Sequence, residues 1–367
     1  MESIVVCAPS VKRLKNKCRY FDFTLCYQKM TIGLLDDDDP NYERLLNDKN
    51  ILVQINAFSC NYRDKGILLK LNDICNEGEV SGKYFYSAFG SEFVGRVLRV
   101  GKEVSLFKKD DRVIMDATYP FRENGDMGGV ISNYASRRFQ IFNEKQLIRI
   151  PDCLSDEEAA GFTVGAQTGY SMVRKAAFQE GQNVIVTAGS SNTSLAVLNQ
   201  LKNKNINIFV LSSNPDFKKL FPGSEKFTIL PPASLKDNTF QEHINGIKFD
   251  VVIDPFFDLH FNELIPFMNF NGKYIFCGFY NQNKYYENQL NKNHFTPSLL
   301  GACITKNISI IANCIGEKQD LLHAIQDYEE GKYKVNIDSV YSGMDVLPFL
   351  QKSFHQLPRF GKVIYKY

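Results

Sequence analysis

From residue 183 onward, short apolar segments alternate with helical segments, and this alternation limits the possible folds more than any other feature of the chain. The apolar segments are continuous and rich in β-branched residues, and they cover 183–187, 206–211, 249–254, 272–278 and 308–312. Such runs, separated by helices, are typical of parallel strands that are buried on both faces. The sequence therefore predicts an α/β chain with a doubly wound parallel sheet in this part.

The first of these strands passes into a helix through the loop Ala188–Ser194, which reads AGSSNTS. A strand, a tight turn and a helix start form a place for a dinucleotide pyrophosphate, because the free N–H groups and the positive end of the helix dipole meet the phosphates. The usual fingerprint has three glycines, which allow the tight turn, the close approach of the backbone to pyrophosphate and the packing of the helix. This loop has only Gly189.

Small polar residues stand where the other glycines would be. The hydroxyls of Ser190 and Ser191 can donate hydrogen bonds to phosphate oxygens. Asn192 tolerates left-handed backbone, and Ser194 can stand at the contact between helix and strand. We expect a working phosphate loop. The alternative is a loop that keeps the fold and has lost the cofactor, in a non-catalytic protein.

The end of the second strand indicates which nicotinamide cofactor the site would take. NAD sites place an acid about 20 residues after the loop, where it binds the ribose 2′-hydroxyl. Here the strand ends in Ser212 and Ser213, and no acid occurs before Asp216. The serines can bond a 2′-phosphate, and Lys218 or Lys219 can neutralise it, although a solvent-exposed helix face also explains the lysines. We predict NADPH rather than NADH.

The part before residue 150 is rich in short strands. Segments 50–57, 93–100, 111–115 and 140–142 predict a small barrel or folded sheet. The pattern changes at Pro151, after which Ser155 and Glu158 form the capping-box signature of a helix start. The chain therefore divides into a β-rich part and an α/β part.

The composition excludes several classes of function. The net charge is +2, from 43 basic and 41 acidic residues, which is too balanced for a nucleic-acid or membrane partner. No apolar run approaches the roughly 18 residues of a membrane span, and the N-terminal segment lacks the leading positive charge of a signal peptide. Nine scattered cysteines without a Cys-x-x-Cys pair indicate reduced thiols, so we expect a cytoplasmic protein.

Several motifs occur in the order found in a known enzyme family. The segment Ala57–Asp64 ends in Asn-Tyr-Arg-Asp. The segment Gly90–Val113 carries a Gly-x-Glu…Val-Gly…Asp-Arg-Val pattern, in which Asp110 replaces a glycine. The segment Leu350–Lys362 matches a C-terminal helix that is followed by a Gly-Lys-Val strand. In this order the motifs resemble the medium-chain dehydrogenase/reductase superfamily, and most closely its zinc-independent quinone oxidoreductase and enoyl reductase branch. The resemblance implies a GroES-like catalytic domain, 1–150 with 315–367, and a Rossmann cofactor domain, 151–314.

Zinc divides this superfamily, and the resemblance puts the chain among the members without it. Asn61 stands where zinc-dependent members have a Cys ligand, and Ser91, which precedes Glu92, stands where they have a His ligand. Cys60 is one residue out of register, and we interpret it as a packing residue. No Cys occurs between residues 76 and 152, so the four-cysteine structural lobe is also missing. We therefore predict no metal, which argues against ordinary alcohol oxidation.

A site without a Lewis acid can transfer hydride to an acceptor that is already activated, such as an enone, a quinone or an α,β-unsaturated thioester. The predicted function is therefore a zinc-independent, NADPH-dependent reductase of such a double bond in a small molecule. The alternative is the reduction of a C=N or C=O group on a biosynthetic intermediate, and this intermediate can be bound to a carrier.

The resemblance also implies roles for single residues. Tyr62 is a candidate proton donor, with simple packing at the cleft wall as the alternative. The predicted substrate cleft contains Asn61, Tyr62, Phe279 and Tyr280. The predicted cofactor contacts are Thr168, Gly189, Ser190, Ser191, Asn192, Ser212, Ser213, Lys218, Cys277, Gly278 and Lys362, of which Lys362 would lie near the phosphates. The strand 308–312 resembles the one that pairs subunits in the superfamily, so we expect a homodimer.

Overall fold

The structure is a computed structural model, and it describes residues 2–14, 18–36, 47–81, 86–119, 128–236, 239–280, 297–355 and 358–367. The chain forms two compact units. Unit 1 comprises Met1–Thr118, Gly128–Val164 and Ile337–Tyr367, and unit 2 comprises Tyr119–Met127 and Gly165–Asn336. The boundaries between the two units lie at other residues than the boundaries predicted for the two domains. The predicted domain boundaries, at residues 150 and 314, remain a prediction.

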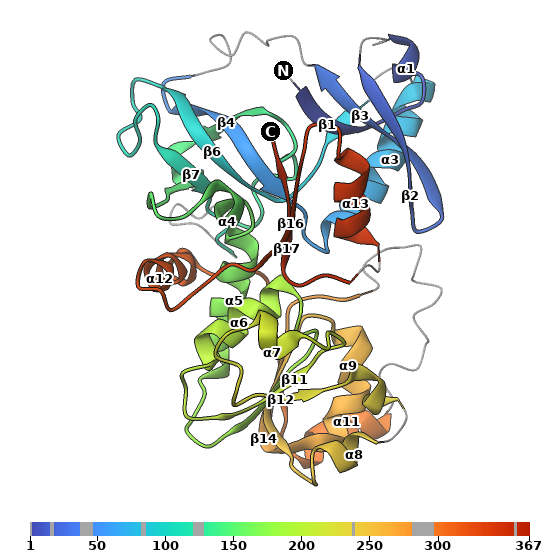
Figure 1. Ribbon diagram of the computed structural model, residues 1–367, viewed down its shortest axis with the longest axis vertical. Coiled ribbons are helices and arrows are strands. Elements are labelled where there is room, and N and C mark those ends of the chain that lie inside the picture. Colours follow the sequence, from blue (N-terminus) through green and yellow to red (C-terminus); the bar gives the residue numbers. More distant parts are fainter. Residues whose placement is uncertain are drawn as a thin grey trace. The chain divides into compact units, whose positions relative to one another are not determined.

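Unit 1 contains two sheets. A four-stranded sheet has the order β2-β3-β1-β5, and a seven-stranded sheet has the order β16-β17-β4-β6-β7-β9, with β8 paired to β4. The strands are β1 (Glu2–Cys7), β2 (Arg19–Leu25), β3 (Gln28–Asp36), β4 (Asn50–Ser59), β5 (Tyr86–Ala88), β6 (Glu92–Val100), β7 (Arg112–Met115), β8 (Phe139–Asn143), β9 (Leu147–Arg149), β16 (Ile337–Ser342) and β17 (Lys362–Lys366). The four segments predicted as strands in this part are confirmed as β4, β6, β7 and β8 (Figure 1).

The pairing of β17 places the C-terminal segment beside β4. β17 pairs with β4 so that Ile364 lies opposite Ser59, and β4 pairs with β6 so that Ser59 lies opposite Glu92. The sheet therefore gathers the end of β4, the start of β6 and the start of β17. The helices of this unit are α1 (Val11–Leu14), α3 (Asp64–Ser81), α4 (Asp156–Ala160) and α13 (Val346–Phe354). Ser155 caps α4 by accepting from the N–H of Glu158 at 3.2 Å, as predicted.

Unit 2 contains a six-stranded sheet whose strand pairs are all parallel. The strands are β10 (Asn183–Val186), β11 (Asn207–Leu211), β12 (Thr228–Leu230), β13 (Phe249–Asp254), β14 (Met268–Phe276) and β15 (Ser309–Ala312). Their order is β12-β11-β10-β13-β14-β15, which confirms the predicted doubly wound sheet. The strand order reverses between β10 and β13, and open α/β sheets bind ligands at such a point.

Helices cover both faces of this sheet (Figure 1). They are α5 (Thr163–Ala176), α6 (Asn192–Leu201), α7 (Phe217–Leu220), α8 (Phe240–His243), α9 (Phe257–Leu264), α11 (Pro297–Thr305) and α12 (Lys318–Glu329). On one face, Phe240 of α8 and Phe261 of α9 pack with Tyr274 of β14. α5 and α6 lie so close together that a Cβ at Gly169 would be 2.8 Å from the Cβ of Ala196. Burial on both faces is the reason that these strands are continuous apolar runs.

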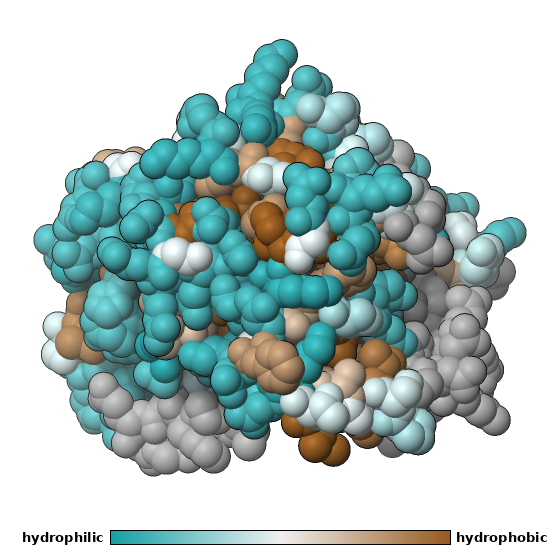
Figure 2. Space-filling model, turned by 90° about the horizontal axis from the view of Figure 1, so that it is seen from below, coloured by the Kyte–Doolittle hydropathy of each residue, from teal (hydrophilic) through white to brown (hydrophobic). Residues whose placement is uncertain are grey.

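The surface of the molecule is shown from one side in Figure 2. That face is mostly hydrophilic, and its hydrophobic residues gather in small, separate patches. Such patches are ordinary on folded chains. Among the helices that the structure describes, none combines the length and apolar character needed to cross a membrane.

Candidate functional site

The candidate phosphate loop follows β10, at the point where the order of the unit 2 sheet reverses. Ala188 has a positive φ of 47°. The next residue must be a glycine, because a Cβ at Gly189 would overlap the side chain of Val210. The N–H of Gly189 donates to the carbonyl of Leu211 at 2.8 Å, which ties the loop to the end of β11. The one glycine that the loop keeps is therefore the one that its packing requires.

Serine hydroxyls hold the rest of the loop. Ser191 is the N-cap of α6, and its Oγ accepts from the N–H of Ser194 at 3.2 Å. The hydroxyl of Ser194 donates to the carbonyl of Thr187 at 2.7 Å, and that of Ser191 donates to Ser194 Oγ at 3.0 Å. Both hydroxyl protons are thus used inside the turn. The predicted bond from Ser191 to a phosphate remains a prediction, and it requires this internal bond to break.

Asn192 is not the left-handed residue of the turn. It is the first residue of α6, whereas Ala188 takes the positive φ. The side-chain amide of Asn192 lies against Gly165 of α5, where any Cβ would overlap it. The amide therefore fixes the start of α6 on α5, which is a packing role that the sequence did not indicate.

The end of β11 lies beside the loop. Ser190 Oγ and Ser212 Oγ are 3.2 Å apart, and Ser212 is buried. Ser213 and Lys218 are exposed, the latter on the short helix α7. The structure thus brings Ser212 next to the candidate phosphate loop and leaves Ser213 and Lys218 accessible. Selection of a 2′-phosphate by these residues remains a prediction.

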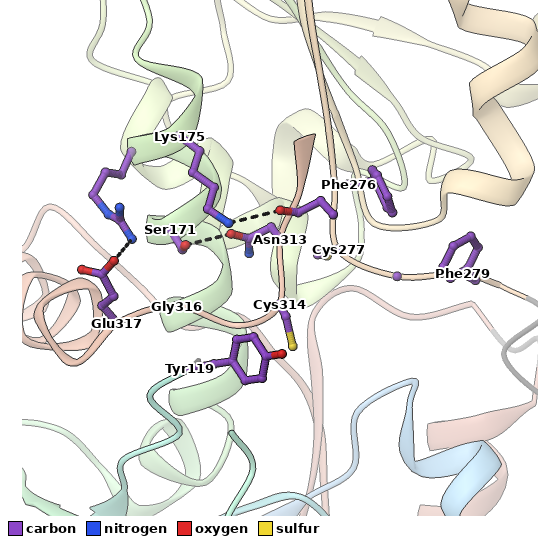
Figure 3. Close-up of a pocket in the computed structure, with 13 residues that line it drawn as sticks. Tyr119, Ser171, Lys175, Phe276, Cys277, Phe279, Asn313, Cys314, Gly316 and Glu317 are labelled. Carbon is purple, nitrogen blue, oxygen red and sulfur yellow. Dashed lines mark hydrogen bonds and ion pairs between the residues drawn. The ribbon is translucent and has the colours of Figure 1, made fainter. Parts of the chain in front are cut away.

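A cavity of about 740 Å³ opens at the carboxyl ends of β14 and β15 (Figure 3). Hydrogen bonds fix its polar wall, because Ser171 of α5 donates to Asn313 Oδ1 at 2.8 Å and Lys175 donates to the carbonyl of Ala312 at 3.2 Å. Its volume lies in the range of ordinary small-molecule sites. The lining includes three residues that the sequence predicted as cofactor or substrate contacts, Cys277, Gly278 and Phe279.

The thiol of Cys277 forms part of this wall in its protonated form. Burial raises its pKa to about 12, and the thiolate is the reactive form of a cysteine. Its predicted role therefore remains packing beside the nicotinamide ring of a bound cofactor.

Thr168 is buried within α5, and the N–H of Tyr280 donates to Asp258 Oδ1 at 2.6 Å. The contacts predicted for these two residues remain predictions.

In unit 1, the amine of Lys362 forms a buried ion pair with Glu92, and the two side chains are 4% and 0% exposed. The amine also donates to Asn61 Oδ1 at 2.7 Å and to Ser59 Oγ at 3.1 Å. A buried ammonium needs such oxygens, because they replace the water it has lost. The predicted contact of Lys362 with cofactor phosphates remains a prediction, since these partners belong to unit 1 and the phosphate loop to unit 2.

Asn61 and Ser91 lie together and continue this network. Asn61 Nδ2 donates to Ser91 Oγ at 2.9 Å and to Glu92 Oε1 at 2.8 Å, and the Ser91 hydroxyl donates to Asp64 Oδ2 at 2.6 Å. Burial raises the pKa of Asp64, although the bonds from Ser91 and Asn61 act in the opposite direction. Within the described parts of the chain, no three His, Cys, Asp or Glu side chains are grouped as metal ligands.

Known proteins resemble the chain over parts of its length or over most of it. Residues 47–152 match the alcohol dehydrogenase GroES-like domain. The acryloyl-coenzyme A reductase of Metallosphaera sedula is 24% identical over 333 residues, which are 86% of this chain and 91% of that protein. The quinone oxidoreductase-like protein 2 of Mus musculus is 37% identical over 115 residues, which are 31% of this chain and 29% of that protein.

Solved structures share the fold. An NAD-dependent alcohol dehydrogenase matches all of both chains with a TM-score of 0.73 at 19% identity. The domain match, the similarity to the acryloyl-coenzyme A reductase and the shared fold confirm the predicted resemblance to the medium-chain dehydrogenase/reductase superfamily. A second solved structure, a 2-octenoyl-CoA carboxylase/reductase in complex with NADP and 2-octenoyl-CoA, has a TM-score of 0.71 at 16% identity, and the match covers 100% of this chain and 87% of that chain. At these identities the two structures establish the fold and leave the substrate open.

Tyr62 is the residue next to Asn61 in the predicted substrate cleft. Its hydroxyl oxygen is buried, and the amine of Lys65 lies 5.5 Å from the centre of its ring. Its role as a proton donor remains a prediction. Cys60, interpreted from the sequence as a packing residue, is buried, and burial raises its pKa well above the ordinary value.

Sequence reasoning missed one charged group near the phosphate loop. Asp254, the last residue of β13, is fully buried and accepts a hydrogen bond from the hydroxyl of Thr187 at 2.5 Å. The sequence does carry a signal for it, because an acid directly follows the apolar run Val251–Ile253. A buried acid needs donors around it, so such a position predicts a polar cluster at the end of the strand.

Proposed function

We propose that this protein is a zinc-independent, NADPH-dependent reductase that transfers hydride to an activated double bond of an enone, a quinone or an α,β-unsaturated thioester. One observation carries the proposal. Asn61 and Ser91, at two positions where the resemblance puts metal ligands, are bonded to one another and tied to the buried amine of Lys362 through Asn61 and Glu92. These contacts among an amide, a hydroxyl and a buried ion pair support an acceptor that needs no metal activation.

The cofactor part of the proposal rests on unit 2. The loop Gly189–Ser194 opens onto the N-terminus of α6, where N–H groups and the helix dipole favour phosphate. Ser212, Ser213 and Lys218 follow β11 without an acid that would favour NAD. The related 2-octenoyl-CoA reductase was solved with NADP, and this supports NADPH over NADH.

The protein's own residues would bind and orient the reactants. NADPH, when bound, supplies the hydride. Thr168, Cys277 and Gly278 would contact its nicotinamide ring, and Asn61, Phe279 and Tyr280 would contact the substrate. Tyr62 would donate the proton to the carbon next to the one that receives hydride. Thioester substrates gain support from the acryloyl-coenzyme A reductase, whose match spans most of both chains.

The proposal includes a homodimer formed through β15. β15 is an edge strand of the unit 2 sheet, and three of its four residues are exposed. An exposed strand edge offers unpaired N–H and C=O groups to a second copy of the chain. Sedimentation of the pure protein tests this part, and a single monomeric species at micromolar concentration would contradict it.

A second candidate is a non-catalytic protein whose loop no longer binds cofactor. It is favoured by one observation, the use of the Ser191 and Ser194 hydroxyl protons inside the turn. Titration of NADPH fluorescence with pure protein separates the two candidates, because only the reductase gives saturable binding.

The substrate class needs a separate experiment. Oxidation of NADPH is followed with an enone, a quinone, an enoyl thioester, an imine and an aldehyde as acceptors. Turnover of the first three types supports the proposal, whereas turnover of only the imine or the aldehyde supports the alternative of C=N or C=O reduction.

A further inference from the structure

A fully buried carboxylate lies at the point where the order of the unit 2 sheet reverses. Asp254 ends β13, and Thr187 directly follows β10, the neighbouring strand. Two other buried acids each pair with a cation, Glu92 with Lys362 and Asp320 with Arg174. Asp254 instead has a histidine and two hydroxyls as partners, and one of the hydroxyls belongs to Thr187, the residue before the candidate phosphate loop.

The two carboxylate oxygens of Asp254 are well supplied with donors. Oδ1 accepts from the Thr187 hydroxyl at 2.5 Å, from the N–H of Phe256 at 2.9 Å and from His260 Nδ1 at 2.9 Å. Oδ2 accepts from the hydroxyl of Tyr274 at 2.5 Å. Burial acts to raise the pKa of this carboxyl, but His260 and the hydroxyl bonds outweigh it and hold the pKa below its ordinary value. The group is therefore a carboxylate at neutral pH.

Hydrogen bonds connect this carboxylate to the helix that would meet the phosphates. Thr187 donates to Asp254 through its side chain, and its carbonyl accepts from the hydroxyl of Ser194 at 2.7 Å. The N–H of Ser194 donates in turn to the Oγ of Ser191, the N-cap of α6. The path runs without a break from β13 to the first turn of α6. It supplies, through hydroxyl groups, the fixed turn geometry that the usual loop takes from glycines.

We propose that Asp254 and His260 are positioning residues for the phosphate loop: Asp254 fixes Thr187 and, through Ser194, the start of α6, and His260 holds the carboxylate of Asp254 in place through its Nδ1. This inference rests on the proposed use of NADPH. The loop is then ready for phosphate before the cofactor arrives, and binding loses less conformational freedom.

The first experiment compares two substitutions of Thr187. Thr187→Val keeps the shape of the side chain and removes the donor to Asp254, whereas Thr187→Ser keeps the hydroxyl. We expect the Kd of NADPH, measured by fluorescence titration, to rise about ten-fold in T187V, which corresponds to about 1.4 kcal/mol, and to return towards the wild-type value in T187S. Thr228→Val, an exposed threonine of β12 in the same sheet, is the control for the loss of a hydroxyl.

The second experiment measures the Kd of NADPH for wild type and His260→Leu at one pH. Leucine removes the ring nitrogen that contacts Asp254 Oδ1 at 2.9 Å. We expect the Kd of NADPH to be higher for H260L than for the wild type.

The outcomes separate this inference from the proposed function. If the wild type binds no NADPH, the proposed function and this inference both fail. If the wild type binds NADPH and either T187V or H260L binds it equally well, this inference alone is overturned. The comparison with H260L stands even where T187V does not fold.

Discussion

At the scale of single residues, the candidate sites are held by polar groups buried in close-fitting sets. The amine of Lys362 lies among Glu92, Asn61 and Ser59. The sequence identified Asn61 and Ser91 because each falls at a fixed place in a motif. It did not indicate the pairing of Glu92 with Lys362, since 270 residues separate them and only the register of β4, β6 and β17 brings them together. The partners of the buried amine of Lys362 therefore depend on how the strands pair in the sheet, and no local sequence pattern indicates them.

The ion pair of unit 1 predicts a large loss of stability when it is broken. Lys362→Met leaves Glu92 buried without its cation, and removing one partner of a buried pair costs about 3–5 kcal/mol. Lys366→Met is the matched control, because the side chain of Lys366 is 46% exposed in its pair with Glu157 and exposed pairs contribute about 0–1 kcal/mol. Urea unfolding measures both losses. Equal losses in the two variants would contradict the role given to Lys362.

Asp64 predicts a pH dependence of stability. Burial raises its pKa in the folded protein, so the folded state keeps this proton to a higher pH than the unfolded chain, in which Asp titrates near about 3.9. Between these two pKa values the folded state binds more protons, and this group's contribution to stability falls as the pH rises. Asp64→Asn removes the titration and keeps one oxygen as acceptor. The stability of D64N relative to wild type should therefore increase from pH 4 to pH 7 in urea unfolding, and a constant difference would count against the assignment.

At the scale of elements, the strands of unit 2 were predictable because burial on both faces makes each of them a continuous apolar run. The strand β16 was not, since every residue of Ile337–Ser342 is partly or fully exposed and the segment carries no apolar signal. β1, β2 and β3 form their own sheet and were not singled out either. Within the phosphate loop, the sequence identified the turn but not the way it is built, because capping and backbone φ depend on which hydroxyl reaches which N–H.

The helix cap at Ser191 gives a prediction at this scale. Ser191→Ala removes the acceptor for the N–H of Ser194 and should destabilise the protein by about 1 kcal/mol, whereas Ser191→Gly should cost only a few tenths, about 0.3 kcal/mol, because glycine is a tolerated N-cap. The free energies of unfolding of the two variants measure this. If S191A is as stable as the wild type, the side-chain cap is not what holds the start of α6.

At the scale of the whole molecule, the two units divide the proposed work. Unit 2 carries the phosphate loop and the cavity at the ends of β14 and β15, and unit 1 carries the network around Lys362. The superfamily and its two kinds of sheet were predictable from the sequence, because its motifs occur in order along nearly the whole chain. The substrate was not, since the shape of a cleft depends on side chains drawn from many separate segments.

Independence from metal is a prediction for the complete enzyme. Reduction of the best acceptor should proceed at an unchanged rate after incubation with a strong chelator followed by dialysis, because Asn61 and Ser91 offer no thiolate or imidazole ligand to zinc. The control is an enzyme sample that receives zinc after the same treatment. Loss of activity on chelation, with recovery when zinc is added, would contradict this part of the account.

The central claim is that the glycine-poor loop of unit 2 binds NADPH. The most direct measurement is a fluorescence titration of NADPH and of NADH with the pure protein at one salt concentration and one pH. The account predicts saturable binding of both cofactors, with NADPH bound more tightly because Ser212, Ser213 and Lys218 follow β11 where an NAD site would have an acid. The absence of saturable NADPH binding at high micromolar protein would contradict it.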